Sequence, residues 1–403
     1  MEFSIDRNSV NYSGKIFVFL QWLFYLQLFT ASGEVSIRDI TIGLLFIFYI
    51  IWKLYRKDAN LLNTSFNKPI LIFFAFSILS LLKAEDLYMA GRSIVTPIFT
   101  YLVFYFMVIE LIEPKKINKY INILFLGMLT FVSYGLYVDN FTSDRFFLRN
   151  NNRGSFAAIV ILFAISLLIS QRGKWYHKCL YTSGFLLSFP ALFSHSRGGF
   201  LGFSGAILLW LVLVLFKGIN IKKVIMIILV VAIVIGAYGN FDNIQNRLDG
   251  TFDDYGDDAR IRMWRTSYNL ILENPVLGIG VGNFSSTATN YVVEVMDERA
   301  WSSGHRHPHN MFVQIPLEQG IISLFIFGFL LIKAYILAFK NYLYYDEKSW
   351  GFFAGITLIV TLTSVMIHSF VDYPLRATYN GIPIILLTVF NLHYYQMRKV
   401  ENE

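Results

Sequence analysis

Charged residues are scarce in this sequence. They make up 15% of the 403 residues, whereas apolar residues make up 55%. Ordinary soluble domains contain about 25% charged residues, so this composition excludes a soluble globular domain and a disordered chain. Basic residues exceed acidic ones and give a net charge of +7. In so apolar a chain this surplus does not indicate a nucleic-acid partner, and the topology of a membrane protein explains it better.

Cysteine is almost absent, and no targeting segment is predicted. Cys179 is the only cysteine, which excludes an intrachain disulfide. Residues 1–14 are polar, and the first apolar run has no small-x-small cleavage site before charge resumes. We therefore expect no cleavable signal peptide.

Long apolar runs fill most of the chain. A membrane-spanning helix needs about 20 apolar residues, and unbroken runs favour helices over the alternating strands of a barrel. The expected fold is an all-α polytopic membrane protein. Residues 1–239 would hold nine transmembrane helices, 240–308 one large polar loop, and 309–403 three further helices. The runs lie at 16–31, 39–55, 69–83, 93–112, 118–138, 154–171, 177–194, 198–216, 224–239, 309–332, 350–371 and 379–396.

Lysine is confined almost entirely to one face of this predicted topology. With the N-terminus inside, the inner segments carry 16 of the 17 lysines, Lys333 among them. Cytoplasmic loops are rich in basic residues, so both termini are expected inside. The outer segments instead carry 13 arginines and Lys83. Because the planar arginine fork matches phosphate, we favour an outer anion site over simple pairing with acidic residues such as Asp257 and Asp258.

Arg197 lies in a short outward turn between two apolar runs, with the sequence SHSRGG at 194–199. The helix that follows carries small residues at 202, 204 and 205, which let neighbouring helices approach closely. An arginine at membrane depth is costly and is usually functional. The alternative is an interfacial arginine whose side chain reaches the lipid headgroups, and both interpretations fit the spacing.

An amphipathic helix is expected in the large loop, with Asp257 or Asp258 as its N-cap and Pro275 beyond its end. Arg260 would lie in its first turn, where free backbone N–H groups favour anions. An exposed helix that carries a few arginines is the alternative. The apolar positions of this helix are Ile261, Trp264, Tyr268 and Ile271.

Two further patterns in the loop have simpler explanations than a bound ligand. The acidic run at 253–258 lacks the spacing of a calcium loop, and helix capping with local ion pairs accounts for it better. The GIGVG stretch at 278–282 is similar to a nucleotide-binding loop but lacks the preceding strand. We interpret it as a tight turn.

Histidines gather where the tenth apolar run begins, in the sequence HRHPHN at 305–310. His309 lies at the expected membrane edge, and imidazoles exchange protons near neutral pH. Asn310, Gln314 and Glu318 follow on one helical face, and polar groups at such depth usually face a bundle interior or a wet cavity. Pro316 and Gly320 are expected to interrupt this helix. Zinc is the alternative, but three histidines without a nearby cysteine or glutamate are a weak zinc pattern. We favour a proton-handling histidine.

These motifs resemble the O-antigen ligase and polymerase superfamily of bacterial envelope glycosyltransferases. The family's R-x-x-x-L motif reads Arg197-Gly-Gly-Phe-Leu201 here. Its H-[NSQ]-x9-G-x-x-[GTY] motif reads His309-Asn310, nine residues, and Gly320-Ile-Ile-Ser323, with a departure at Ser323. The stretch Ala259-Arg260-x-x-Met263, followed by Asn-Pro-x-x-Gly-x-Gly, is similar as well. With twelve runs and one large outer loop, the resemblance covers the whole chain.

The resemblance implies that a glycan is transferred from undecaprenyl diphosphate on the periplasmic side of the bacterial inner membrane, without a metal or other cofactor. In a ligase the acceptor is lipid A–core, and in a polymerase it is another lipid-linked repeat unit. A flippase for lipid-linked glycans is the alternative of another class. Mid-membrane charges are few, chiefly Glu318 and Glu110, and this favours chemistry at the outer leaflet.

Single-step inverting transfer is the expected mechanism, with His309 as the base that takes the proton of the acceptor hydroxyl. Arginines would neutralise the departing diphosphate. Arg197 and Arg260 are the first candidates, and Arg145, Arg149 and Arg153 are the helpers. Asn310, Asp372 and Arg376 complete the candidate substrate site, the last two to position the sugar or His309. The expected partners are the lipid-linked donor, the lipid A–core acceptor and the bilayer.

Overall fold

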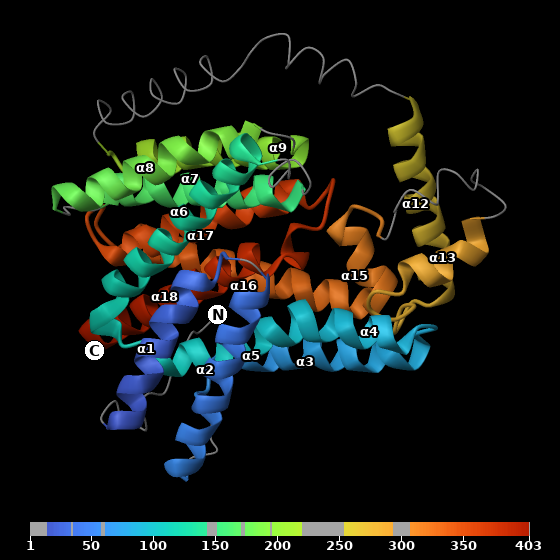
Figure 1. Ribbon diagram of the computed structural model, residues 1–403, viewed down its shortest axis with the longest axis horizontal. Coiled ribbons are helices and arrows are strands. Elements are labelled where there is room, and N and C mark those ends of the chain that lie inside the picture. The colour runs from blue at the N-terminus through green and yellow to red at the C-terminus, as the bar shows by residue number, and fades with distance from the viewer. Residues whose placement is uncertain are drawn as a thin grey trace.

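The computed structural model describes residues 14–33, 35–57, 61–142, 151–170, 174–193, 196–219, 254–292 and 307–402 (Figure 1). These parts of the chain are helical and contain no β-strand. The first half holds α1 (Lys15–Thr30), α2 (Val35–Tyr55), α3 (Asn67–Leu79), η1 (Ser80–Lys83), α4 (Leu87–Ser93), η2 (Ile94–Phe99), α5 (Thr100–Leu111), η3 (Pro114–Lys116), α6 (Ile117–Phe141), α7 (Asn151–Ser170), α8 (Trp175–Phe193) and α9 (Arg197–Phe216). The second half holds α12 (Asp254–Glu273), α13 (Phe284–Val292), α15 (Met311–Gln319), α16 (Ile321–Tyr344), α17 (Trp350–His368), η5 (Pro374–Arg376) and α18 (Thr378–Asn402).

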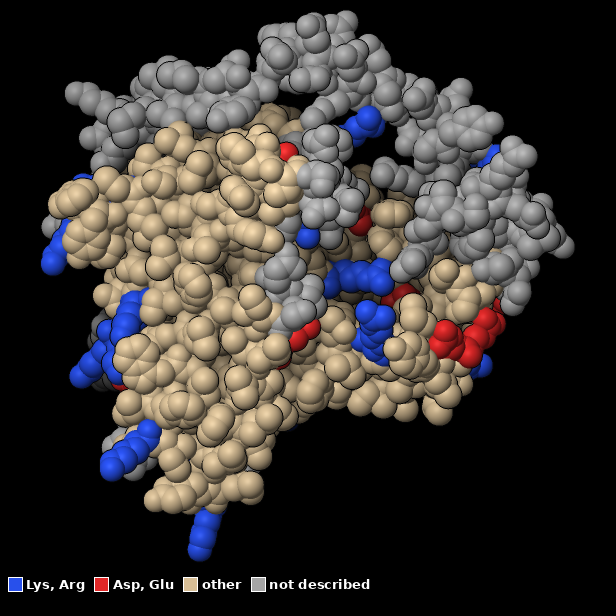
Figure 2. All heavy atoms as spheres, viewed as in Figure 1, with Lys and Arg blue, Asp and Glu red and all other residues tan. Residues whose placement is uncertain are grey.

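The protein is a polytopic all-α membrane protein, as the composition predicts. Among the described residues, six helices are long and apolar enough to cross a membrane. Large apolar side chains such as Phe141 and Phe216 are 77% and 74% exposed on the outside of the bundle, where lipid rather than water would cover them. In Figure 2 a broad tan surface almost free of blue and red atoms lies between the charged side chains at the left edge and those at the centre and right. The expected run at 224–239 lies outside the described residues.

Helices α7 and α17 form the centre of the bundle. The apolar stretches of α7 and α17 are 89% and 83% buried, and both helices pack against α9. Glycines make this packing close: a Cβ on Gly202 of α9 would overlap the carbonyl oxygen of Ser364 in α17. This confirms that the small residues after Arg197 serve helix–helix approach.

The apolar run at 309–332 is interrupted at Gly320, as the sequence predicts, but its second helix extends beyond residue 332. The chain breaks at Gly320, where φ is +81°, so α15 ends there and α16 continues to Tyr344. Lys333 therefore lies in the middle of a helix and not in a loop. Its ammonium donates to the carbonyl of Ser65 and lies 5.0 Å from the centroid of the Phe66 ring, which compensates for its burial.

Four connections meet at one end of the bundle, which we call the site end: residues 84–86, 274–283, 307–310 and 369–377. The backbone N–H of Asp86 donates to Asn283 Oδ1 at 2.7 Å. The backbone N–H of Met311 donates to the carbonyl of Ser369 at 2.9 Å. In Figure 1 this end carries α12, α13 and α15. Segments far apart in the sequence are thus fastened together here.

The glycines of the GIGVG stretch adopt backbone conformations that only glycine takes readily. Gly278, Gly280 and Gly282 have φ values of 67°, 93° and 74°, which confirms the expected tight turn. A Cβ on Gly278 would lie 2.5 Å from the carbonyl carbon of Glu318. The turn therefore packs directly on the last residues of α15.

Candidate functional site

His309 lies at the site end beside Asp372. Its Nδ1 is 3.4 Å from Asp372 Oδ1, and the two side chains are 25% and 6% exposed. The ring of His307 lies against it, with a centroid separation of 4.1 Å. His309 also has a φ of +50°, which is unusual for a residue other than glycine. Backbone strain of this kind is common at functional sites.

Local hydrogen bonds fix the backbone on both sides of this pair. Asn310 caps α15, because its Oδ1 accepts from the backbone N–H of Phe312 at 2.9 Å and of Val313 at 3.3 Å. The side-chain oxygen of Asn310 is thus already engaged with its own helix. Across the site, the N–H of Asp372 donates to the carbonyl of His368 at 3.1 Å. The positions of both site residues are therefore set by the ends of helices.

The Asp372 carboxyl is held in its charged form. Burial by itself raises its pKa, but the hydrogen bond from His309, the charges of His309 and His307 and the N–H of Tyr373 hold that pKa well below its usual range. A carboxylate can only accept hydrogen bonds. Nδ1 of His309 is therefore the donor toward Asp372, and in the neutral ring Nε2 is left as the proton acceptor.

Arg197 and Arg153 lie at the starts of α9 and α7, two helices that pack against each other. Ser196 caps α9 through an oxygen that accepts the N–H of Gly199 at 2.9 Å, so Arg197 stands at the positive end of that helix and is exposed. A Cβ on Gly199 would lie 2.8 Å from the carbonyl carbon of Gly154. Arg153, the neighbour of Gly154, hydrogen-bonds to Tyr379.

Arg376 reaches the site from the connection before α18. It ends the short helix η5 and is exposed, and its charge acts on buried Glu318. Glu318 in turn accepts from Gln314 Nε2 at 2.5 Å. The expected polar face of α15 is therefore present between Gln314 and Glu318.

The amphipathic helix is present as α12, but two expectations about it are wrong. It begins at Asp254, so Asp257 and Asp258 lie within its first turns and not at the N-cap. Its buried apolar positions are Met263 and Leu270, whereas two residues of the expected stripe face outward. Packing against α13 and the end of α15 decides which face is covered. The outward residues are Ile261, 44% exposed, and Tyr268, 61% exposed.

Helix α12 docks next to the catalytic candidate. Trp264 Nε1 donates to the carbonyl of Pro308 at 2.8 Å, one residue before His309. Arg260 lies one helical turn before Trp264 along α12, although its side chain is not described. Arg145 and Arg149 lie outside the described residues.

Two buried side chains of the site were not predicted from sequence. His368 ends α17, its Nδ1 is hydrogen-bonded to Ser155 of α7, and a Cβ on Gly198 of α9 would overlap its ring. Arg38 is 3% exposed, pairs with Asp39 at 3.0 Å and acts electrostatically on Tyr379. The sequence offered one indication for each. Arg38 is an outer arginine next to the start of an apolar run, and His368 precedes Asp372 by four residues, about one helical turn.

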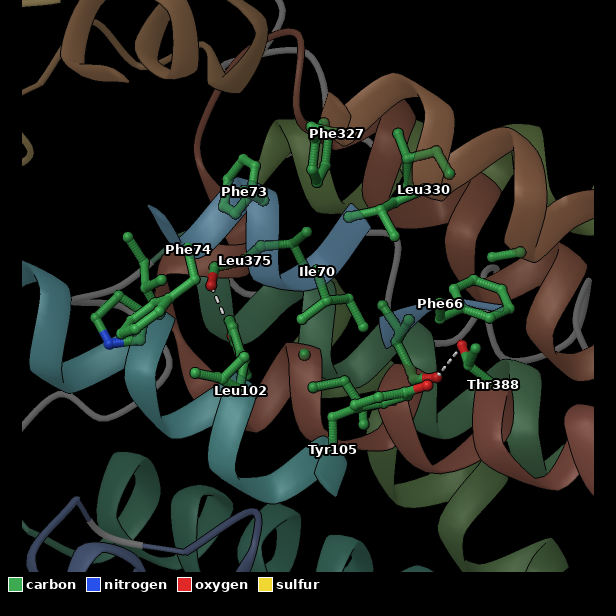
Figure 3. A pocket seen from close by; sticks show the side chains of 18 of the residues that line it. Phe66, Ile70, Phe73, Phe74, Leu102, Tyr105, Phe327, Leu330, Leu375 and Thr388 are labelled. Carbon is green, nitrogen blue, oxygen red and sulfur yellow. Dashed lines mark hydrogen bonds between the residues drawn. The ribbon is translucent and has the colours of Figure 1, made fainter. Parts of the chain in front are cut away.

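An apolar cavity of about 230 Å³ extends from the site end into the bundle. It lies among α3, η2, α5, α15, α16, α17 and α18, and aromatic and aliphatic side chains line it (Figure 3). Met311 and Ile315 of α15 form part of its wall, and Tyr373 and Leu375 belong to the connection that carries Asp372. Tyr101 donates to the carbonyl of Leu375 at 2.6 Å. The cavity and the His309–Asp372 pair thus share two segments.

Comparison with known proteins gives two matches. The O-antigen ligase family model matches residues 182–328, a range that includes Arg197, Arg260 and His309. A protein of Rickettsia conorii named "Putative polysaccharide ligase" is 34% identical over 76 residues. That alignment spans 18% of this chain and 18% of the relative, so it covers only a small part of either protein.

Proposed function

We propose that this chain transfers O-antigen glycan from undecaprenyl diphosphate to lipid A–core, because the O-antigen ligase family model matches its residues 182–328. The reaction takes place on the periplasmic face of the bacterial inner membrane. The observation that carries this proposal is the His309–Asp372 pair, which lies at the site end beside the arginine-bearing ends of α7 and α9.

His309 is the general base in this mechanism. Asp372 holds the Nδ1–H, so Nε2 faces the acceptor and takes the proton of the attacking hydroxyl. The hydroxyl oxygen bonds to the anomeric carbon while the bond to the diphosphate breaks, and the configuration inverts. Asp372 also stabilises the imidazolium that results, as a buried carboxylate does beside a protonated ring. This step needs no metal.

Arginines stabilise the departing diphosphate. Arg197 uses the positive end of α9 together with its own fork, and Arg153, Arg260 and Arg376 add charge from three other segments. The outer arginines Arg145 and Arg149 belong to the connection before α7. A diphosphate leaving group that is neutralised in this way has no need of a general acid.

The apolar cavity supports a lipid-linked donor. It starts at the connection that carries Asp372 and continues between helices that lipid surrounds. A polyprenyl chain can bury its first units there while the diphosphate stays at the site end. This arrangement places the scissile bond at the boundary between apolar and charged surfaces.

A deletion strain tests the proposed acceptor. Core-only lipopolysaccharide with accumulated lipid-linked long chains is the result expected of a ligase. Core that carries a single repeat unit would instead identify a polymerase, which shares the donor chemistry. Purified protein reconstituted with donor distinguishes both from a flippase, because only an enzyme forms the new glycosidic bond.

A further inference from the structure

We infer that His307, His309 and Asp372 form a binding site for a zinc-like transition-metal ion that inhibits the proposed transfer. Each residue offers one ligand atom, and the three atoms lie within 4.8 Å of one another. The sequence alone made zinc a weak interpretation because no acidic ligand stood near the histidines. The fold supplies that ligand from 63 positions further along the chain.

The geometry is close to that of a tetrahedral site. Zinc lies about 2.0–2.2 Å from nitrogen and oxygen ligands, so two ligand atoms of a tetrahedron are about 3.3–3.6 Å apart. His309 Nδ1 and Asp372 Oδ1 are 3.4 Å apart already. His307 offers the third ligand atom, within 4.8 Å of the other two, and it has to move closer for a metal to bind all three. The fourth position is left for water or for an acceptor hydroxyl.

The donor set selects the class of metal. Calcium and magnesium prefer six or more oxygen ligands, and this site offers two imidazoles and one carboxylate. Imidazole nitrogen favours zinc, copper and nickel.

Inhibition follows from the chemistry of the imidazole ring. If Nδ1 of His309 binds the metal, the neutral ring carries its proton on Nε2, and Nε2 cannot accept another. If Nε2 binds the metal, its lone pair is occupied. In both cases the proposed base is blocked, and Asp372 no longer orients it. This consequence rests on the proposed function, whereas the site itself does not.

Metal binding is measured on the full-length protein, without a polyhistidine tag, in detergent. A Cys179→Ser background removes the exposed thiol of Cys179, which is another possible zinc ligand. Competition with a chromophoric chelator should show one Zn²⁺ per chain and no competition by Mg²⁺. His307→Asn should weaken zinc binding at least about tenfold. Asparagine can still accept the N–H of His309, as His307 Nδ1 does at 3.4 Å.

Transfer assays test the inhibition separately. Zn²⁺ should stop transfer by the Cys179→Ser protein, and a chelator should restore it. His307→Asn should resist the zinc concentration that stops its parent, when the rate of each protein is compared with its own rate without zinc. Equal zinc affinity in both proteins would overturn the site, and loss of transfer on chelation would overturn the inhibitory role. If neither protein transfers glycan, the proposed function fails while the binding result still decides the site.

Discussion

At the scale of single residues, the proposed site combines a histidine base, a carboxylate that orients it, and several arginines. His309 Nδ1 and Asp372 Oδ1 are 3.4 Å apart. In the proposed mechanism His309 accepts the proton, and Asp372 orients the ring. Asp372 stays charged because its hydrogen-bonding partners outweigh its burial. Arg197 adds a permanent positive charge at the start of α9, where the free backbone N–H groups also favour an anion.

His309→Ala should lower the transfer rate by about 10²–10⁴, the usual contribution of a general base. Donor binding should persist, because the base acts on the acceptor proton and not on the diphosphate. His177→Ala is the control, since His177 lies near the start of α8 at the other end of the bundle. Initial rates and donor affinity at matched protein levels decide the outcome, and a His309→Ala protein with parental rates would disprove the base assignment.

Arg197→Lys should fail substantially although it keeps the charge, because lysine cannot form the two parallel hydrogen bonds of the guanidinium fork. Arg56→Lys is the matched control. Arg56 stacks over Trp52 at 4.9 Å, beyond the end of α2 away from the site, and its substitution should leave transfer unchanged. Should Arg197→Lys work at the parental rate, Arg197 is only an interfacial anchor and the diphosphate binds elsewhere.

At the scale of helices, close packing keeps the arginine-bearing ends in register. Helix α9 lies against α17 through glycine, and the His368 ring at the end of α17 meets both α7 and α9. Asp372 follows that end by four residues. A shift of α9 against α17 would therefore move Arg197 relative to the His309–Asp372 pair.

Gly202→Ala should destabilise the protein by about 1–3 kcal/mol, the usual cost of overpacking, and should reduce transfer as well. The added methyl would overlap the Ser364 carbonyl of α17. Gly43→Ala in α2 is the control, because no atom lies within 4 Å of its new Cβ, and alanine should be neutral or slightly stabilising there. Thermal unfolding in detergent compares the two, and an equal effect would contradict the packing argument.

At the scale of the whole molecule, charge divides the bundle into two unlike ends. Lysines and the buried Lys53–Glu110 pair, 3.0 Å apart, lie toward one end. Asp372 and most of the described outer arginines lie at the other. The positive-inside rule predicts that the lysine end is cytoplasmic, and the proposed transfer requires the site end to be periplasmic.

Thiol labelling of intact spheroplasts checks this orientation. An impermeant maleimide should leave Cys179 unlabelled, although the side chain is exposed on α8, because it would face the cytoplasm. Leu272→Cys in a Cys179→Ser background should react, since Leu272 is 61% exposed on α12. Permeabilised cells give the control in which both thiols are labelled. The reverse pattern would invert the proposed topology.

Hydropathy and charge determined that this protein is a membrane protein, because both are properties of single residues that do not depend on tertiary contacts. The apolar runs predicted an all-α membrane bundle, and the structure contains one. The motifs around Arg197 and His309 indicated the family that residues 182–328 match. Gly320 interrupts the run at 309–332 as predicted, and the structure adds that a Cβ there would overlap the carbonyl oxygen of Val276. The end of the second helix at Tyr344 was not predicted.

Only the tertiary structure decided which residues meet. Asp372 lies 63 positions from His309, and no local pattern fixes that distance. Arg38 is buried beside Tyr379 from the opposite end of the chain, and the cavity exists only where helices from both halves of the chain come together. The covered face of α12 likewise depended on what packs against it. Contacts between distant segments arise from packing and hydrogen bonding in three dimensions, which the order of residues along one helix does not encode.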